Sequence, residues 1–212
     1  MIELGLKFTL AYLLGSVLGS LVVGYLKGGV DIRRVGSGNA GGTNALRTQG
    51  KAFAFWVMVI DVGKGALAAA WIPKLALPGV GFDPAVAREL VLYAVGVGAV
   101  AGHVFPIWFG FQGGKGGATA AGVLTYFAPL VALPVVAAWI ALVFLTGYVG
   151  LATITAVVGA AVFIGLTRLP EQHGLFAFAC VVGALIVYTH RSNIRRMLDG
   201  TEARFRRIHD SK

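Results

Sequence analysis

The sequence predicts an all-α integral membrane protein, a polytopic transmembrane helical bundle with about seven spans, and three observations support this class. Of the 212 residues, 57% are hydrophobic and only 13% are charged, against about a quarter in soluble domains. The mean hydropathy is +0.80. The apolar residues also gather in long runs. A soluble globule cannot bury so much apolar surface, so we exclude an ordinary cytosolic enzyme and a soluble nucleic-acid-binding domain.

Apolar runs follow one another near residues 4–26, 53–73, 90–104, 118–131, 132–147, 150–167 and 174–189. A span needs about 20 residues, because a helix rises about 1.5 Å per residue and the hydrocarbon core is about 30 Å thick. The stretch 118–147 would be about 45 Å long as one helix. As two spans it gives helices that are short for a bilayer, with Pro129 and Pro134 where a tight reversal would be needed, and one strongly tilted helix is the alternative. The length suggests a single domain over residues 1–212.

The net charge of +9 helps to orient these spans, since basic residues concentrate on the cytoplasmic side of membrane proteins. With seven spans and the N-terminus outside, thirteen of the 18 Lys and Arg residues face the cytoplasm, four face outside and Lys64 lies within a span. With six spans, the basic tail that holds Arg206, Arg207 and Lys212 would lie opposite the basic loop 27–51. The sequence therefore favours seven spans and a cytoplasmic C-terminus.

The sequence contains little that indicates a metal site or an enzyme nucleophile. The one cysteine, Cys180, lies in an apolar run and is predicted to be a small buried residue. No Cys, His and carboxylate cluster has metal-ligand spacing, and there is no G-x-S-x-G nucleophile elbow. We expect no metal, no cofactor and no nucleic-acid partner.

Three polar segments fall on the predicted cytoplasmic side, and the first is residues 36–47. Its glycines permit positive φ and close backbone approach to a ligand. Successive free N–H groups in such a loop bind anions, and arginine adds a bidentate cation. A flexible turn between helices is the alternative. The candidate binding residues are Gly36, Ser37, Gly38, Asn39, Gly41, Thr43, Asn44 and Arg47.

The second polar segment is residues 102–119. It differs from a nucleotide-binding P-loop, because Phe109 stands where that motif needs glycine and Gly116 where it needs Ser or Thr. A glycine-rich backbone, a lysine and the start of a helix still attract anions. A basic residue at the membrane surface is the alternative. The candidates are His103, Gly113, Gly114, Lys115, Gly116 and Thr119.

The third polar segment is residues 190–202, at a helix end. His190 and Asn193 are three residues apart and so face the same side. His190 can be an acid, a base or a phosphate ligand, or it can be structural. Arg195 and Arg196 are interpreted as ordinary cytoplasmic basic residues.

Asp61 and Lys64 lie within the second run, three residues apart, and can pair on one helix face. Ionisable groups in a membrane are costly and face the bundle or a cavity. Lys64 can alternatively extend its amine to the membrane surface. We interpret the two residues as a structural pair or as support for the site.

The three segments resemble the signature motifs of the bacterial membrane-bound acyl-phosphate:glycerol-3-phosphate acyltransferases, the PlsY family. They match GSGNxGxTNxxR from Gly36 to Arg47, GHxFPxxxxFxGGKGxAT from Gly102 to Thr119, and HxxNIxRxxxGxE from His190 to Glu202. Asp61 and Lys64-Gly65 resemble a D-x-x-K-G pattern. Gly150 departs from the family, which often has serine there, and Thr153 is a possible substitute for that hydroxyl.

The resemblance implies transfer of a fatty acyl group from acyl phosphate to the sn-1 hydroxyl of glycerol 3-phosphate. The products are lysophosphatidic acid and phosphate, in the first acylation of phospholipid synthesis. It implies that the glycine-lysine loop holds the phosphate of glycerol 3-phosphate and that Ser37, Arg47, His190 and Asn193 form the catalytic site, with Glu202 in support. It also implies a multi-pass protein of the bacterial inner membrane, a site facing the cytoplasm, contact with membrane lipid, and an acyl-phosphate-producing enzyme as donor source.

This chemistry needs two anionic substrates held in position rather than an enzyme nucleophile. His190, His103 or a substrate phosphate can accept the proton, and we favour the phosphate because no histidine has an evident carboxylate partner in the sequence. The alternative function is a transporter of a small anionic metabolite. Inverted repeats would favour transport, but none is visible, and the polar segments gather at one face rather than at the membrane midplane.

Overall fold

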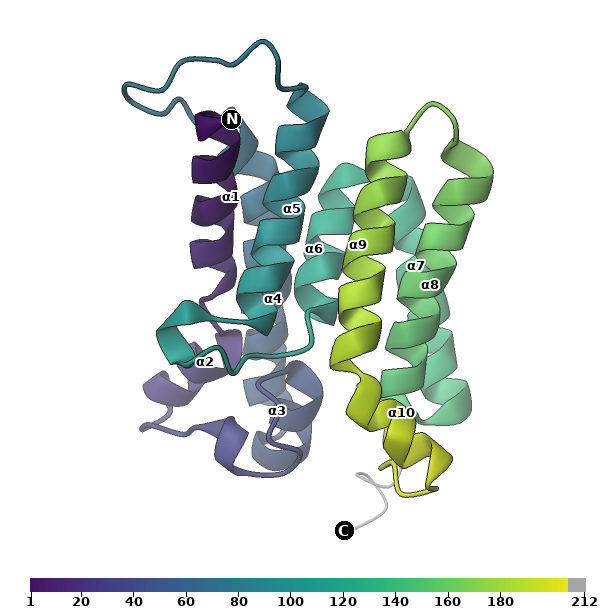
Figure 1. Cartoon of the computed structure of the whole chain (residues 1–212). Helices are drawn as coiled ribbons and strands as arrows, with labels where there is room; N and C mark the ends of the chain where they lie inside the picture. The colour runs from purple at the N-terminus through teal and green to yellow at the C-terminus, as the bar shows by residue number, and fades with distance from the viewer. Residues whose placement is uncertain (206–212) are drawn as a thin grey trace. The chain divides into compact units, whose positions relative to one another are not determined.

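The structure is a computed structural model that describes residues 1–205, and these residues form helices and no β-strand (Figure 1). The predicted fold class, an all-α helical membrane protein, is confirmed. The α-helices are α1 (Ile2–Gly15), α2 (Gly19–Leu26), α3 (Gly42–Gln49), α4 (Lys51–Trp71), α5 (Arg88–Val104), α6 (Gly117–Phe127), α7 (Pro129–Thr146), α8 (Val149–Arg168), α9 (His173–Thr189) and α10 (Arg191–Leu198). Three short 3-10 helices are η1 (Ile32–Arg34), η2 (Ile72–Lys74) and η3 (Ile107–Phe109). The predicted cytoplasmic residues Arg206, Arg207 and Lys212 lie outside the described residues.

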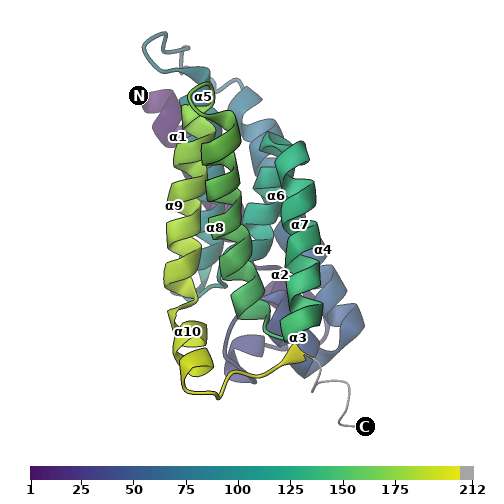
Figure 2. The ribbon, with the colours of Figure 1, turned by 90° about the vertical axis from the view of Figure 1, so that its right-hand side faces the viewer.

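The helices divide into two compact units, Met1–Phe127 and Ala128–Lys212, here called the N-terminal and C-terminal units. In the N-terminal unit, α1 packs against α5, and α4 packs against α5 and α6. In the C-terminal unit, α8 packs between α7 and α9, with α10 at one end of this three-helix layer (Figure 2).

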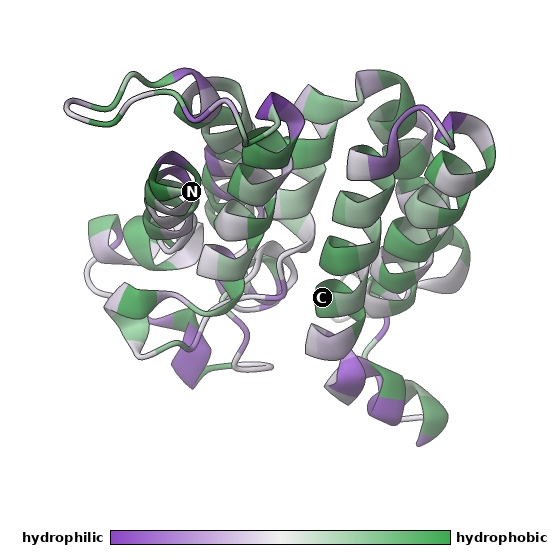
Figure 3. Ribbon diagram, turned by 45° about the horizontal axis from the view of Figure 1, so that its top comes forward, coloured by the Kyte–Doolittle hydropathy of each residue, from purple (hydrophilic) through white to green (hydrophobic). Residues whose placement is uncertain are grey.

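Four segments are long and apolar enough to cross a membrane alone: Lys51–Lys74, Arg88–Phe109, Pro129–Thr146 and Val149–Arg168. Two bent pairs, α1 with α2 and α9 with α10, raise the number to as many as six. Hydrophobic residues cover the long helices, and hydrophilic residues gather toward their ends (Figure 3). With 11 residues, α6 is only about 16 Å long. The count of seven spans and their orientation stay predictions.

The stretch 118–147 forms two helices, as predicted. The break falls at Ala128, earlier than the expected boundary after residue 131. The reason is Pro129, which takes the first position of α7, where its missing N–H costs nothing. Pro134 lies inside α7 and does not end it.

Small residues allow close backbone contact between helices of the N-terminal unit. A Cβ atom on Gly15 of α1 would lie 2.1 Å from the carbonyl oxygen of Ala99 in α5. A Cβ atom on Gly65 of α4 would lie 2.2 Å from the carbonyl oxygen of Thr119 in α6. Such contacts are typical of helices that associate in lipid. They fix α4, α5 and α6, which carry the second polar segment and the Asp61–Lys64 pair.

The prediction that Cys180 is buried is wrong, because its side chain is exposed on α9. The buried residues of α9 include Leu175, Phe178, Ala179 and Val182, which follow a helical spacing that Cys180 does not share.

Candidate active site

The first and second polar segments lie in the N-terminal unit, at the end of the helices opposite the N-terminus (Figure 1). The first joins α2 to α4 through η1 and α3, and the second joins α5 to α6. The structure therefore brings together two glycine-rich loops that are far apart in the sequence. The third segment belongs to the C-terminal unit and is described separately below.

The first segment is organised by Asn44, which is 1% exposed. Its Oδ1 accepts a hydrogen bond from the Ser37 N–H (2.9 Å), and its Nδ2 donates to the carbonyl oxygens of Ile32 (2.9 Å) and Val35 (3.1 Å). Gly36 has φ +63°, as its predicted role requires, and a Cβ there would lie 2.3 Å from Asn44 Oδ1. The amide of Asn44 thus shapes the loop, while Ser37 lies exposed at its tip.

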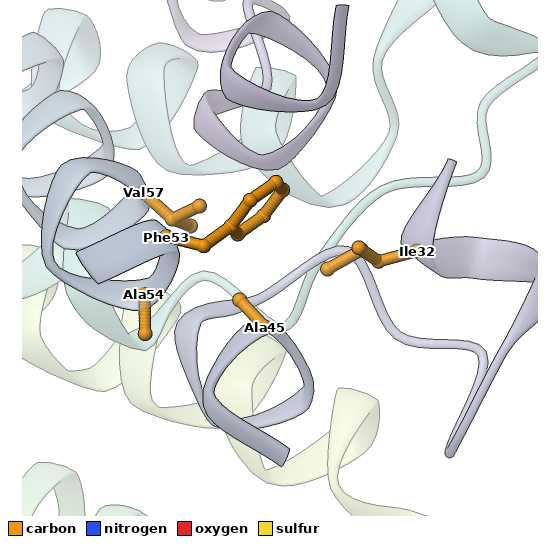
Figure 4. Close-up of a cluster of buried hydrophobic side chains, with 5 residues drawn as sticks. All are labelled: Ile32, Ala45, Phe53, Ala54 and Val57. Atoms are coloured by element: carbon orange, nitrogen blue, oxygen red, sulfur yellow. The ribbon is translucent and has the colours of Figure 1, made fainter. Parts of the chain in front are cut away.

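Apolar packing anchors this segment to α4. Ile32 from η1, Ala45 from α3, and Phe53, Ala54 and Val57 from α4 form one buried cluster (Figure 4). Because η1 and α3 flank the glycine-rich loop, burial of their apolar side chains fixes both ends of the loop.

Arg47 lies in the last turn of α3, four residues after Thr43 and so on the same helix face. The Arg47 side chain is half-buried. Its Nε atom is buried, and no residue in 1–205 provides it with a hydrogen-bond partner. A buried guanidinium N–H without a partner is costly, and an anionic ligand would satisfy it. Arg47 is therefore suited to bind a phosphate at this loop.

Arg33, shortly before the first segment, connects it to the second segment through hydrogen bonds. The sequence did not reveal this role. Arg33 NH1 donates to the carbonyl oxygens of Phe109 and Gln112, each at 3.2 Å. Asp31 orients the guanidinium, with 3.0 Å between Nε and Oδ1 and 2.9 Å between NH2 and Oδ2. These hydrogen bonds from Arg33 hold the pKa of Asp31 below its ordinary value. The spacing of two between Asp31 and Arg33 has no helical periodicity, so only the fold identifies this contact.

Replacing Arg33 by alanine should loosen the second loop. Loss of its hydrogen bonds is worth about 1.4 kcal/mol of local stability, so amide hydrogen exchange in residues 105–112 should accelerate about 10-fold. Arg34→Ala, at the exposed neighbouring position, is the matched control and should leave exchange unchanged. Equal exchange in both variants would contradict the contact.

The effect of pH on this contact has a definite sign. Because the pKa of Asp31 is lowered in the folded protein, its ion pair with Arg33 stabilises the loop at pH values above the ordinary aspartate pKa. The stabilisation is lost as the pH falls through the lowered folded-state pKa. Asp31→Asn should therefore differ from the wild type in loop exchange at neutral pH, and the difference should vanish in strong acid.

In the second segment, the Gly113–Gly114 backbone lies directly on His103. The Gly114 N–H donates to the His103 carbonyl oxygen (3.0 Å). A Cβ atom on Gly113 would lie 2.1 Å from the same oxygen, and a Cβ on Gly114 would lie 2.1 Å from Nε2 of the imidazole. Lys115 follows, half-buried, and α6 begins at Gly117, which confirms the predicted helix start beside the lysine.

Thr119, which the sequence suggested as a binding residue, is fully buried where α6 meets Gly65 of α4. Its Oγ1 has no hydrogen-bond partner among the residues that the structure describes. We therefore place Thr119 in the packing between these helices rather than at the surface of the loop.

Asp61, Lys64 and His103 form a buried cluster behind the second segment. Lys64 Nζ lies 3.0 Å from Asp61 Oδ1, so the predicted pair is confirmed. Lys64 is 4% exposed and does not extend to the membrane surface. His103 Nδ1 lies 3.5 Å from Asp61 Oδ1. The sequence shows no evident carboxylate partner for His103, because only the packing of α4 against α5 brings Asp61 close to it.

The third segment surrounds the kink between α9 and α10. His190, which is 5% exposed, lies at this junction with 2.8 Å between its Nδ1 and the carbonyl oxygen of Ile186. A carbonyl only accepts, so Nδ1 carries a proton, and Nε2 is an acceptor when the ring is neutral. Asn193 Nδ2 donates to Glu202 Oε1 (2.6 Å), and Arg196 Nε pairs with Glu202 Oε2 (2.6 Å). The interpretation of Arg196 as only a cytoplasmic basic residue is incomplete, because it helps to hold Glu202.

Gly150 of α8 lies directly against Asn193. A Cβ atom on Gly150 would lie 3.0 Å from both Cβ and Nδ2 of Asn193. A serine at this position would push on Asn193, so the glycine fits the observed placement of α10. Thr153 does not supply a free hydroxyl: it donates to the Val149 carbonyl (2.9 Å) and accepts from Trp139 Nε1 (3.0 Å).

These features define a helical membrane protein with two glycine-rich loops suited to anions and with a buried histidine and asparagine at a helix kink. The family model described as "Glycerol-3-phosphate acyltransferase" matches residues 6–200. The chain is 43% identical to a glycerol-3-phosphate acyltransferase of Aquifex aeolicus, covering 92% of this chain and 95% of that protein. It is 37% identical to a glycerol-3-phosphate acyltransferase of Bacillus velezensis, covering 96% of this chain and 98% of that protein. The chain belongs to the glycerol-3-phosphate acyltransferase family.

Two solved structures have the same fold. The glycerol 3-phosphate form of PlsY, an integral membrane glycerol 3-phosphate acyltransferase, matches with a TM-score of 0.81 and 39% identity, covering 95% of each chain. The lysophosphatidic acid form matches with a TM-score of 0.79 and 37% identity, covering 95% of this chain and 94% of that one.

Proposed function

We propose that this chain transfers a fatty acyl group from acyl phosphate to the sn-1 hydroxyl of glycerol 3-phosphate, releasing lysophosphatidic acid and phosphate. Family membership supports glycerol 3-phosphate as the acceptor, and PlsY structures hold this substrate and the lysophosphatidic acid product. The observation that carries the proposal is the pairing of two anion-suited loops, fastened by Arg33, at one end of the N-terminal unit. Two loops suit a reaction whose two substrates both carry phosphate.

Acyl phosphate suits this site because it is a mixed anhydride with a good leaving group. The sn-1 oxygen attacks the acyl carbon, the bond from that carbon to the phosphate oxygen breaks, and phosphate leaves with its electron pair. The proton of the sn-1 hydroxyl passes to a phosphate oxygen. No enzyme nucleophile is needed, so catalysis consists of positioning and of stabilising negative charge.

The residues divide between these tasks. The Gly113–Lys115 loop binds the phosphate of glycerol 3-phosphate, and the loop of Ser37 with Arg47 binds the reacting phosphate group. The hydroxyl and the acyl group are oriented by His190 and Asn193. These two side chains are fixed by hydrogen bonds to the Ile186 carbonyl and to Glu202 respectively. Because the motifs come from both units, we propose that residues 1–212 act as one enzyme domain. The apolar helices hold the acyl chain in the plane of the lipid.

An activity assay with purified protein tests the donor and the position of acylation. Palmitoyl phosphate and glycerol 3-phosphate should give 1-acyl lysophosphatidic acid, whereas palmitoyl-CoA and palmitoyl acyl carrier protein should give none. A 2-acyl product, or a preference for the thioesters, would contradict the proposal.

We propose further that the protein lies in the bacterial cell membrane with the site facing the cytoplasm. In a Cys180→Ser background, single cysteines at the exposed positions Arg34, Gln112 and Ser192 should react with a membrane-impermeant maleimide only from the cytoplasmic side. A cysteine at the exposed position Ala85 should react only from the outside. Labelling of Ser192→Cys from outside would contradict both the seven spans and a site shared by the three segments.

A further inference from the structure

The buried cluster behind the glycine-lysine loop has a role that the reaction does not by itself require. Its members, Asp61, Lys64 and His103, are 1%, 4% and 2% exposed, so none of them can meet a substrate at the surface in this arrangement. Burying charge in a membrane protein is expensive, which calls for a functional reason.

The donors of Lys64 determine the protonation of His103. An ammonium group has three N–H donors and no acceptor. Lys64 Nζ lies 2.6 Å from the Val17 carbonyl oxygen, 3.0 Å from Asp61 Oδ1 and 2.9 Å from His103 Nδ1. Each of the three donors thus has one partner, and His103 Nδ1 must accept. The ring proton is therefore on Nε2, and the imidazole is neutral.

Asp61 keeps Lys64 charged and in place. Its Oδ1 accepts from Lys64 and also from the Gly19 N–H at 3.1 Å. A protonated His103 would place an N–H donor against the ammonium at 2.9 Å, which the charge on Lys64 opposes. The pair therefore holds one tautomer of His103.

The other edge of the ring supports the loop. Nε2 is the atom nearest to a Cβ built on Gly114, at 2.1 Å, with Cε1 at 2.9 Å and Cδ2 at 3.0 Å. The backbone carbonyl of the same histidine accepts from the Gly114 N–H. The ring and the backbone carbonyl of His103 together fix the position of Gly114, the residue directly before Lys115.

We propose that Lys64 and Asp61 hold His103 as a neutral imidazole that sets the position of the Gly113–Lys115 loop, so that His103 is a positioning residue and not the general base. The inference rests on the proposed function where it concerns substrate binding. The state of the imidazole can be tested without any activity.

The first experiment measures the imidazole directly. In protein labelled with ¹⁵N-histidine, the His103 signals, identified by their loss in His103→Asn, should show the neutral form with the proton on Nε2 from pH 5 to pH 9. In Lys64→Met, which removes the donor to Nδ1, this single form should be lost. Titration of His103 in the wild type near the ordinary histidine pKa, or a proton on Nδ1, would overturn the proposal even if the protein acylates nothing.

The second experiment measures kinetics. His103→Asn keeps an acceptor toward Lys64 but does not reach Gly114, so KM for glycerol 3-phosphate should rise roughly 10- to 100-fold with kcat little changed. His103→Gln, which extends a polar tip toward Gly114, should recover part of this loss. His173→Asn, at an exposed position on α9, is the control. A fall in kcat of about 10² or more with KM unchanged, together with loss of a limb of the pH–rate profile, would identify His103 as the base and overturn the proposal.

Discussion

Alanine in place of His190 is expected to lower kcat by about 10²–10⁴, the range for loss of a group that handles the reacting proton or orients its donor. The contact between His190 Nδ1 and the Ile186 carbonyl leaves Nε2 as an acceptor, which is the form needed to receive a hydrogen bond from the sn-1 hydroxyl. KM for glycerol 3-phosphate should change less, since we propose that the glycine-lysine loop holds the phosphate.

Glutamine at position 190 separates proton transfer from orientation. The orienting group of His190 is a backbone carbonyl, which fixes the position of the ring, and its side chain is 5% exposed. Because a phosphate oxygen of the substrate is itself present where the proton is released, we expect that oxygen to take the proton and His190→Gln to retain a sizeable share of the activity. The remaining pH dependence should follow the phosphate, whose second pKa is near 6. A folded His190→Gln enzyme that binds glycerol 3-phosphate but has no activity would establish His190 as the base.

Lys115→Ala should mainly raise KM for glycerol 3-phosphate, by roughly 10- to 150-fold, because a charge-assisted bond to an anion is worth about 1.5–3 kcal/mol. The lysine is expected to hold the phosphate equally in the ground state and the transition state, so kcat should change little.

Lys51→Ala is a suitable control for Lys115, because Lys51 is an exposed basic residue at the start of α4, in the same unit. It should alter KM little at moderate salt. If Lys115→Ala instead abolishes kcat and leaves KM unchanged, the lysine acts on the acyl phosphate, and the two loops have exchanged roles.

Much of the fold follows from local signals in the sequence. Apolar runs predicted the long helices, and the spacing of Asp61 and Lys64 predicted their pair, because each signal acts within a few residues. Pro129 and Pro134 together indicated a break in 118–147, but only Pro129 lies at one. The kinks after Gly15 and Thr189 were not predicted. The apolar pattern continues without a break through the kink after Gly15. At Thr189 an apolar helix meets a polar segment, and the sequence did not show that this segment is also helical.

The site was predicted less completely, because several of its contacts join residues that are distant in the sequence. Arg33 reaches Phe109 and Gln112, and His103 reaches Lys64, only once α4, α5 and the loops have packed. Asn44 was predicted as a ligand from its residue type. In the structure its side chain is buried and its three hydrogen bonds go to the backbone of the loop, so it shapes the loop instead. Residue type and spacing identify candidates, but which partner satisfies each polar atom depends on the tertiary structure.

The uneven burial of the long helices has a consequence for handling the protein. Within an apolar stretch of 18 residues in each span, 44% and 56% of the residues are buried in α4 and α5 with their short extensions, against 17% and 22% in α7 and α8. The N-terminal unit thus buries more of its span surface between its own helices, whereas most of the surface of α7 and α8 is left exposed, as expected for helices that face lipid tails. Harsh short-chain detergents should therefore denature the C-terminal unit first, and added phospholipid should restore it, so purification conditions decide whether His190 and Asn193 remain in place.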